Sequence, residues 1–157
     1  MMNITNYTTK WVTNTLIWAL KLQLKGDRVY MFEHDGLTWY LDNYCVRAVP
    51  TPSAYVKVEE APPGVCSNIM HRLIKAECPL TDTRIKHSTG KAGRDCCIFR
   101  AADGTEVGIR EDYVKLTKDL RHAELYAPCA DIKSGMTLVR CDEDPIAVLM
   151  PIKIKEG

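Results

Sequence analysis

The segment from Arg84 to Arg94 contains the residue types that can hold phosphate groups. Two glycines lie among four fixed positive charges with no acidic residue, and the charged members are Arg84, Lys86, Lys91 and Arg94. Backbone amides of a glycine-containing loop, together with Lys and Arg, bind phosphates through contacts that do not depend on base sequence. A nucleotide P-loop is a poor interpretation, because Ala92 stands where the magnesium-binding Ser or Thr would be. We therefore expect an exposed, mobile loop that either contacts nucleic-acid phosphates or is simply solvated.

Thiol and imidazole groups are the second set of candidate functional groups. The candidate zinc ligands are Cys66, His71, Cys78 and His87. Their spacing matches no standard zinc motif, and no CxxC pair occurs in the chain. Cys96 and Cys97 are neighbours on an expected strand, so their side chains point to opposite faces. We therefore predict no metal site and no cofactor.

The seven cysteines also bear on the compartment of the protein. The first residues, Met1 to Lys10, are polar and lack the charged-then-apolar layout of a secretory signal. We therefore expect a cytoplasmic protein in a reducing compartment. There the cysteines would be free thiols that pack as small hydrophobic residues.

No catalytic motif emerges from the sequence. It contains no nucleophile elbow, no HExxH pair and no paired-carboxylate motif. A cysteine-dependent enzyme stays open as an alternative, and it would need one Cys beside a His in a cleft. A non-enzymatic protein is the prediction that we favour.

Composition narrows the class of protein. The chain has 157 residues, of which 46% are hydrophobic and 26% are charged, and its net charge is +1. These proportions are typical of a soluble globular domain and exclude collagen-like, disordered and coiled-coil chains. No apolar run approaches the roughly 20 residues of a membrane helix, so we expect no membrane partner. The near-neutral charge removes the argument that a strong overall basic field attracts DNA.

Hydrophobic periodicity predicts the elements that position these groups. Apolar residues from Val12 to Leu24 recur at a helical period, and Gly26 supplies the left-handed position that commonly closes a helix. Asp35-Gly36 is a hairpin signal between two β-rich runs. Ser67 can cap a short helix that Pro79 ends, and a third helix covers 113–120. The expected strands are 29–33, 37–41, 44–49, 55–58, 84–87, 96–99, 105–109, 124–126, 130–132, 136–140 and 146–150.

This order of elements predicts an α+β fold with antiparallel sheets, because runs of strands are punctuated by single helices. We expect one domain, 1–157, with halves at about 1–60 and 82–157 joined by a Pro-containing loop and short helix over 61–81. The two ends share a plan of helix, hairpin and final strand. The predicted core consists of Leu16, Leu20, Val46, Ile69, Leu73, Ile98, Val114, Leu138, Val148 and Met150.

The C-terminal third has a pattern with a parallel in DNA replication. A helix that begins near Tyr113 and a strand around Leu125 precede the terminal run Ile146-Ala147-Val148-Leu149-Met150-Pro151. Over about residues 107–154 this order resembles the C-terminal domain of bacterial DNA sliding clamps, the β subunit of DNA polymerase III. The resemblance implies a clamp-like pseudosymmetry in which each half is one helix over a small antiparallel sheet. A bacterial clamp subunit carries three such domains, whereas this chain has room for one.

The resemblance also implies a function, a non-enzymatic clamp-like binding protein of a bacterial or phage DNA-replication context. The candidate DNA-binding residues are those of the basic segment and the helix lysines Lys21, Lys25, Lys115 and Lys118. A ring would need a homo-oligomer, and a replication or host protein is a further candidate partner. The alternative from another class is a small protein–protein interaction or inhibitor module. Convergence of the four helix lysines on one concave surface would favour DNA, and their scattering would favour the interaction module.

Overall fold

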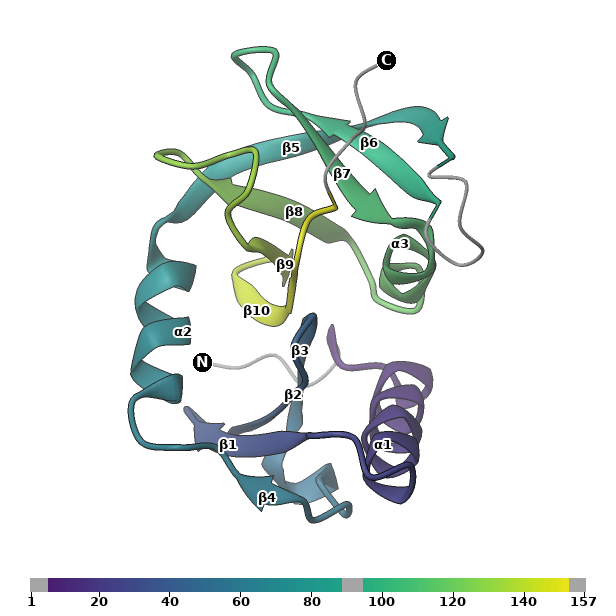
Figure 1. Cartoon of the computed structure of the whole chain (residues 1–157), viewed down its shortest axis with the longest axis vertical. Coiled ribbons are helices and arrows are strands. Elements are labelled where there is room, and N and C mark those ends of the chain that lie inside the picture. Colours follow the sequence, from purple (N-terminus) through teal and green to yellow (C-terminus); the bar gives the residue numbers. More distant parts are fainter. Residues whose placement is uncertain (1–5, 89–94, 153–157) are drawn as a thin grey trace.

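The computed structural model describes residues 6–88 and 95–152 (Figure 1). Within these residues the protein is α+β, as predicted, with three α-helices and one ten-stranded sheet. The helices are α1 (Thr9–Leu24), α2 (Val65–Ile74) and α3 (Glu111–Thr117), and a short 3-10 helix covers Thr51–Ser53. The strands are β1 (Tyr30–His34), β2 (Leu37–Leu41), β3 (Cys45–Pro50), β4 (Glu59–Glu60), β5 (Ala76–His87), β6 (Cys96–Arg100), β7 (Glu106–Arg110), β8 (Ala123–Pro128), β9 (Thr137–Cys141) and β10 (Asp144–Leu149).

The sheet joins two three-stranded meanders at its centre. Its strand order is β4-β1-β2-β3-β10-β9-β8-β5-β6-β7. Neighbouring strands are antiparallel except β1 and β4, which are parallel. β3 and β10 meet with Val46 opposite Val148. One helix precedes each meander, α1 the first and α3 the second, and both helices lie on the same side of the molecule, away from α2 (Figure 1).

The two ends of the sheet are finished differently. At one end β4 is only two residues long, and both are exposed glutamates, which is one way to blunt an open edge. At the other end β5 pairs with β8 through its first residues and with β6 through its last. The backbone N–H of Ile152 donates to the carbonyl of Gly108 in β7 at 2.8 Å. The chain that leaves β10 thus returns to β7, and the C-terminal half closes on itself.

Half of the ten predicted core residues are buried, and two of the predictions are wrong. Five of them lie in the core, namely Val46, Ile69, Ile98, Leu138 and Val148. Leu16 and Val114 are half-buried, and the side chain of Leu73 lies outside the described part. The predictions for Leu20 and Met150 are wrong, because these side chains are 42% and 37% exposed. Leu20 is exposed because α1 is rotated to bury other residues, and Met150 follows the last residue of β10.

Three strand predictions are also corrected. Residues 55–58 form no strand, because side chains from other elements take their carbonyls: Tyr40 donates to Val56 at 2.6 Å and Gln23 to Lys57 at 3.2 Å. Residues 130–132 belong to the turn between β8 and β9. The strand expected at 84–87 begins at 76 and includes Pro79, the residue expected to stop a helix.

The prediction that every cysteine is a free thiol is wrong. Cys78 and Cys129 form a disulfide with a Cα–Cα distance of 5.4 Å. Cys78 lies in β5 and Cys129 directly follows β8, so the pairing of these strands brings the two thiols together. None of the helices in the described ranges has both the length and the apolar character needed to cross a membrane.

Candidate interaction face

The start of α1 is fixed by hydrogen bonds to the segment that follows α3. Thr8 is the N-cap: its hydroxyl accepts from the backbone N–H of Trp11 at 3.1 Å and donates to the carbonyl of Asp119 at 2.6 Å. The Asp119 carboxylate accepts from Asn14 at 2.9 Å and pairs with Lys10 at 3.1 Å. A capping hydroxyl satisfies an otherwise orphaned helix donor, so Thr8 both starts the helix and ties it to the other half.

The rotation of α1 about its axis is set by the residues that it buries. Trp11, Thr15 and Ala19 face the sheet, with exposed fractions of 2%, 0% and 0%. The indole N–H of Trp11 donates to the carbonyl of Ala48 in β3 at 2.9 Å. Thr15 and Ala19 are small, so the helix can approach the strands closely. The Ala48 carbonyl gives the buried indole N–H an acceptor, and this bond helps to set which face of α1 turns inward.

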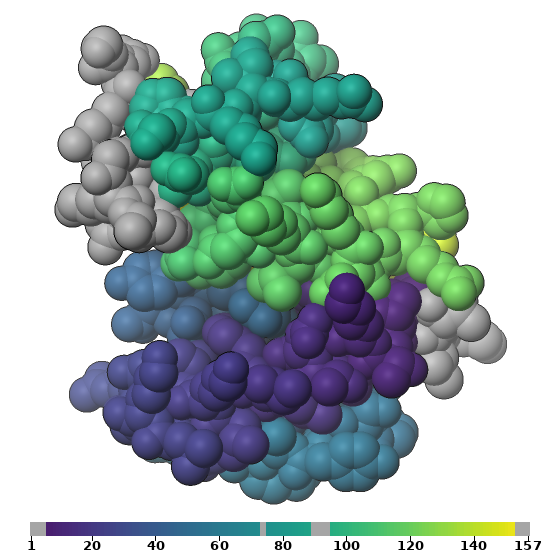
Figure 2. Space-filling view, turned by 90° about the vertical axis from the view of Figure 1, so that its right-hand side faces the viewer, coloured from purple at the N-terminus to yellow at the C-terminus, as the bar shows by residue number. Residues whose placement is uncertain are grey.

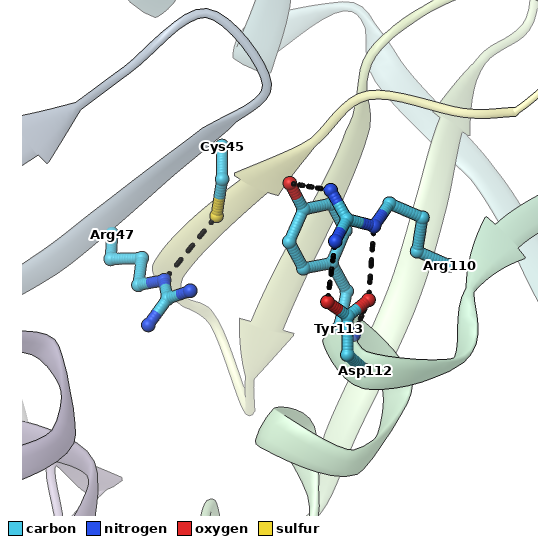
Figure 3. A network of polar contacts seen from close by, with 5 residues as sticks. All are labelled: Cys45, Arg47, Arg110, Asp112 and Tyr113. Carbon is cyan, nitrogen blue, oxygen red and sulfur yellow. Dashed lines mark hydrogen bonds and ion pairs between the residues drawn. The ribbon is translucent and has the colours of Figure 1, made fainter. Parts of the chain in front are cut away.

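A buried arginine holds the middle of α1 on β3. The Arg47 guanidinium stacks over the Trp18 ring at 4.0 Å, and its Nε donates to the Sγ of Cys45 at 3.4 Å (Figure 3). Arg47 is only 5% exposed. Such a cation–π contact is strongest where water is excluded, so the pair fixes α1 rather than offering a charge to solvent.

The face of α1 opposite the sheet carries large aliphatic side chains. Ile17, Leu20 and Leu24 are 44%, 42% and 77% exposed. Their spacing of i, i+3 and i+7 places them in one stripe along the helix. Figure 2 looks onto this side of the molecule, where α1 lies across the lower half with no other segment over it. We call Ile17, Leu20 and Leu24 the apolar stripe.

Lysines run along one border of the apolar stripe. At 3.6 residues per turn, Lys10, Lys21 and Lys25 all lie on the same side of it. All three are exposed, and residues 9–25 contain no acidic residue. Lys10 is paired with Asp119, whereas Lys21 and Lys25 form no ion pair with any described residue. The outer face of α1 is therefore apolar in the middle and positive along one edge.

Helix α3 presents a different surface. It begins with Glu111 and Asp112, and Glu111 pairs with Lys86 of β5 at 2.7 Å and with Lys115 at 3.7 Å. Lys86 holds the pKa of the Glu111 carboxyl below its usual value. Two bonds of 3.0 and 2.6 Å join Arg110 to Asp112 (Figure 3). The basic side chains around α3 are thus largely matched by carboxylates.

The described members of the predicted DNA-binding set come from α1, from α3 with the turn after it, and from β5, and Lys86 and Lys115 meet at Glu111. Lys115 and Lys118 are exposed on and just after α3, close to the start of α1. Lys21 lies roughly 16 Å further along the α1 axis than Lys10, and Lys25 lies beyond it. Arg84 is exposed at a bulge in β5, where its backbone has a φ of 59° and its N–H donates to Asp82. Lys91 and Arg94 lie outside the described residues.

The zinc candidates are dispersed, and one of them is ruled out. Cys66 and His71 belong to α2, while Cys78 and His87 belong to β5. Cys78 is bound in the disulfide, so it cannot be a thiolate ligand. Within residues 6–88 and 95–152, no group of three or more His, Cys, Asp or Glu side chains lies close enough together to hold a metal ion.

The buried thiols are poor nucleophiles. Burial raises the pKa of Cys45, and the neighbouring Arg47 only partly opposes this effect. Burial likewise raises the pKa of Cys96 and Cys97, and that of Cys141 to about 12. A nucleophilic cysteine needs the opposite shift, because the thiolate is the reactive form. These four residues therefore pack as small hydrophobic groups, as the sequence led us to expect.

A hollow of about 110 Å³ lies between the β2–β3 turn and the end of β10. Tyr44, Ile69 and Met150 are among its lining residues. Ligand sites for small molecules usually occupy roughly 300–1,000 Å³, so this hollow has room for about one side chain.

Sequence reasoning identified the lysines of α1 but missed the apolar stripe beside them. A signal was available: nine large or aliphatic residues from Trp11 to Leu24 are more than one buried helix face requires.

Comparisons with protein-family models, with curated proteins and with solved structures find no match to this chain.

Proposed function

We propose that this protein is a non-enzymatic protein–protein interaction module whose working surface is the outer face of α1. The observation that carries the proposal is the apolar stripe, three large aliphatic side chains held in solvent on one side of a well-anchored helix. Burial of apolar area contributes roughly 25 cal/mol per Å², so a protein that covers the stripe gains affinity from it. A phosphate backbone offers no matching apolar surface.

Two further observations support this reading over the others. The upward pKa shifts of four buried thiols disfavour an enzyme that uses any of these four as its nucleophile. The pairing of Lys86 and Lys115 with Glu111 disfavours a basic DNA-binding surface around α3. On the side of the molecule that carries α1 and α3, these observations leave the apolar stripe as the candidate binding surface.

A photo-crosslinking amino acid placed at position 20 tests the proposal in the cells that make the protein. A matched copy carries it at Ile85, which is 52% exposed and apolar but lies on β5. We expect a protein adduct of defined mass from position 20 and none from position 85. Adducts with nucleic acid, equal adducts from both positions, or none from position 20 would contradict the proposal.

The second candidate is a clamp-like binding protein that contacts DNA in bacterial or phage replication. The repeated order of helix and three-stranded meander favours it, with β3 and β10 paired antiparallel at the centre and both helices on one side (Figure 1). A clamp-like pseudosymmetry would account for this repeated order. A homo-oligomeric ring would then bring the lysines of several copies around a duplex.

Light scattering and duplex binding decide on this candidate. A ring requires a closed oligomer. Each lost contact to a duplex phosphate should make the negative slope of log affinity against log salt shallower by about 0.9. A closed oligomer whose Lys21→Ala/Lys25→Ala variant shows this change would establish the clamp reading. A monomer that does not bind a generic duplex at low salt would leave the interaction module.

A further inference from the structure

The charge pattern around the apolar stripe identifies the kind of partner, and we infer that α1 binds an acidic amphipathic helix of another protein. The inference rests on the proposed function, because it names the partner of the same surface. It depends on three features of α1: the length of the stripe, the side on which its lysines lie, and the absence of acids from residues 9–25.

The stripe matches the contact face of a second helix. From Ile17 to Leu24 it runs roughly 10 Å along the axis, or about two helical turns. An amphipathic helix presents anchors at i, i+3 or i+4, and i+7, which is the same spacing. Two such rows can interdigitate over this length without any change in α1.

The lysines beside the apolar stripe favour a partner helix with negative charge. Lys21 and Lys25 are exposed beside the stripe and lie on the same border as Lys10. A partner helix with Glu or Asp along its facing border would place opposite charges next to the two lysines. Charges at the rim of an interface set partner choice more than total affinity, so they would discriminate between helices with the same apolar row.

Other occupants of this face fit less well. A second copy of α1 in antiparallel packing would bring three lysines against three lysines, and in either orientation it would offer them no acid. Membrane-surface helices commonly place Trp or Phe on the lipid side, whereas Trp11 and Trp18 of α1 are turned toward the sheet. Duplex DNA would cover the lysines and leave the stripe in water.

Three synthetic peptides provide the test, each a helix of about four turns with the same leucine row. Their flanking positions carry glutamate, glutamine or lysine. Fluorescence anisotropy would measure their affinity for the full chain, for Lys21→Glu/Lys25→Glu, and for Leu20→Ser/Leu24→Ser. Lys118→Glu/Arg121→Glu is the matched control, since it reverses the same number of exposed charges just after α3. Circular dichroism confirms that each variant is folded.

We expect the acidic peptide to bind most tightly and the lysine peptide least. Lys21→Glu/Lys25→Glu should weaken the acidic peptide by at least about tenfold and strengthen the lysine peptide, while the control changes neither. Leu20→Ser/Leu24→Ser should abolish the binding of all three. Equal binding of the three peptides through the stripe would overturn the acidic partner but leave the interaction module in place.

Other outcomes would overturn both. They are the failure of every peptide to bind, or binding that Leu20→Ser/Leu24→Ser leaves unchanged. Stripe-dependent binding to vesicles of anionic lipid, or lysine-dependent binding to a generic duplex, with no peptide bound, would identify a membrane or DNA as the occupant instead.

Discussion

The half built from α1 and β1–β3 and the half built from α3 and β8–β10 follow one order of elements, yet they treat their helices differently. α1 has 16 residues, no acid, and an exposed apolar stripe. α3 has seven residues, starts with two acids, and has Lys86, Lys115 and Arg110 paired with carboxylates. The half with α3 is also closed by the return of the chain to β7 and cross-linked by a disulfide. The half with α3 therefore stabilises the fold, whereas the half with α1 leaves the outer face of this helix exposed for binding.

The largest expected effect tests how α1 is held. Trp11→Ala should lower the free energy of unfolding by about 4 kcal/mol, because it opens a cavity and leaves the Ala48 carbonyl without its donor. Trp11→Phe keeps most of the volume and should lose only about 1 kcal/mol. Urea unfolding measures both. If the two substitutions had equal effects, the indole hydrogen bond rather than packing would anchor the helix.

The disulfide should contribute nearly as much, and only to the closed half. Cys78 and Cys129 are 51 residues apart, so reduction frees a long loop in the unfolded chain and should lower stability by about 4 kcal/mol. Hydrogen exchange on the reduced protein should show lost protection in β5 and β8 before β1 and β2. Faster exchange in β1 and β2 would contradict the distinction between a more stable half with α3 and a less constrained half with α1.

Alkaline pH should weaken the fold through buried groups in both halves. The pKa of Cys141 is raised from 9.0 to about 12 and that of Tyr40 from 10.0 to about 12, mainly by burial. The unfolded chain therefore releases these protons at lower pH than the folded chain. The stability is complete below about pH 9 and is lost as the pH rises toward 12, by up to about 1.4 kcal/mol per pH unit for each group.

Both halves should respond from about pH 9, because each contains a buried thiol whose pKa burial raises, Cys45 in β3 and Cys141 in β9. Urea unfolding from pH 8 to pH 11 measures the slope, and Cys141→Ala should flatten its beginning. A stability that rises over this range would contradict the direction of both pKa shifts.

A smaller effect is expected where the two halves are joined. Asp119→Ala removes the hydrogen bond from Asn14 and the ion pair with Lys10, so it should lower the free energy of unfolding by about 1–2 kcal/mol. Lys10→Ala removes only an exposed pair and should change it by less than about 1 kcal/mol. Thermal denaturation distinguishes these two results. Equal losses would mean that the ion pair, and not Asn14, joins α1 to the second half.

The smallest effect concerns the apolar stripe itself. Leu24→Ser should change the free energy of unfolding by no more than about 0.5 kcal/mol, because the side chain is 77% exposed. Leu138→Ala, at a residue that is 1% exposed, should lose about 3 kcal/mol. A large loss for Leu24→Ser would show that the stripe serves the fold and is not held for a partner.

Local signals predicted much of the fold. β2 has the bounds expected from its β-rich run, and the turn at Asp35-Gly36 is present, with both residues at positive φ. Elements that depend on distant residues were missed or misplaced. Pro79 was expected to end a helix, but its backbone is paired with Tyr126 of β8, which no local pattern reveals. The Cys78–Cys129 bond follows from the same strand pairing.

The candidate site could be predicted only in part. The lysines of α1 are visible in the sequence, but the apolar residues of this helix extend around most of its circumference. Which arc faces the sheet is decided by the bond from Trp11 to Ala48 and by the small size of Thr15 and Ala19. These are tertiary constraints, so helical periodicity alone placed Leu20 in the core.

Mapping the acidic peptide onto the protein by NMR tests the central claim most directly. Backbone amide signals of the labelled full chain would be followed while the glutamate-flanked peptide is added. We predict shifts confined to α1, largest between Thr13 and Lys25, with those of 111–117 in α3 unchanged. Shifts centred on α3, or on the hollow beside Tyr44, would contradict the claim that the outer face of α1 is the interaction surface.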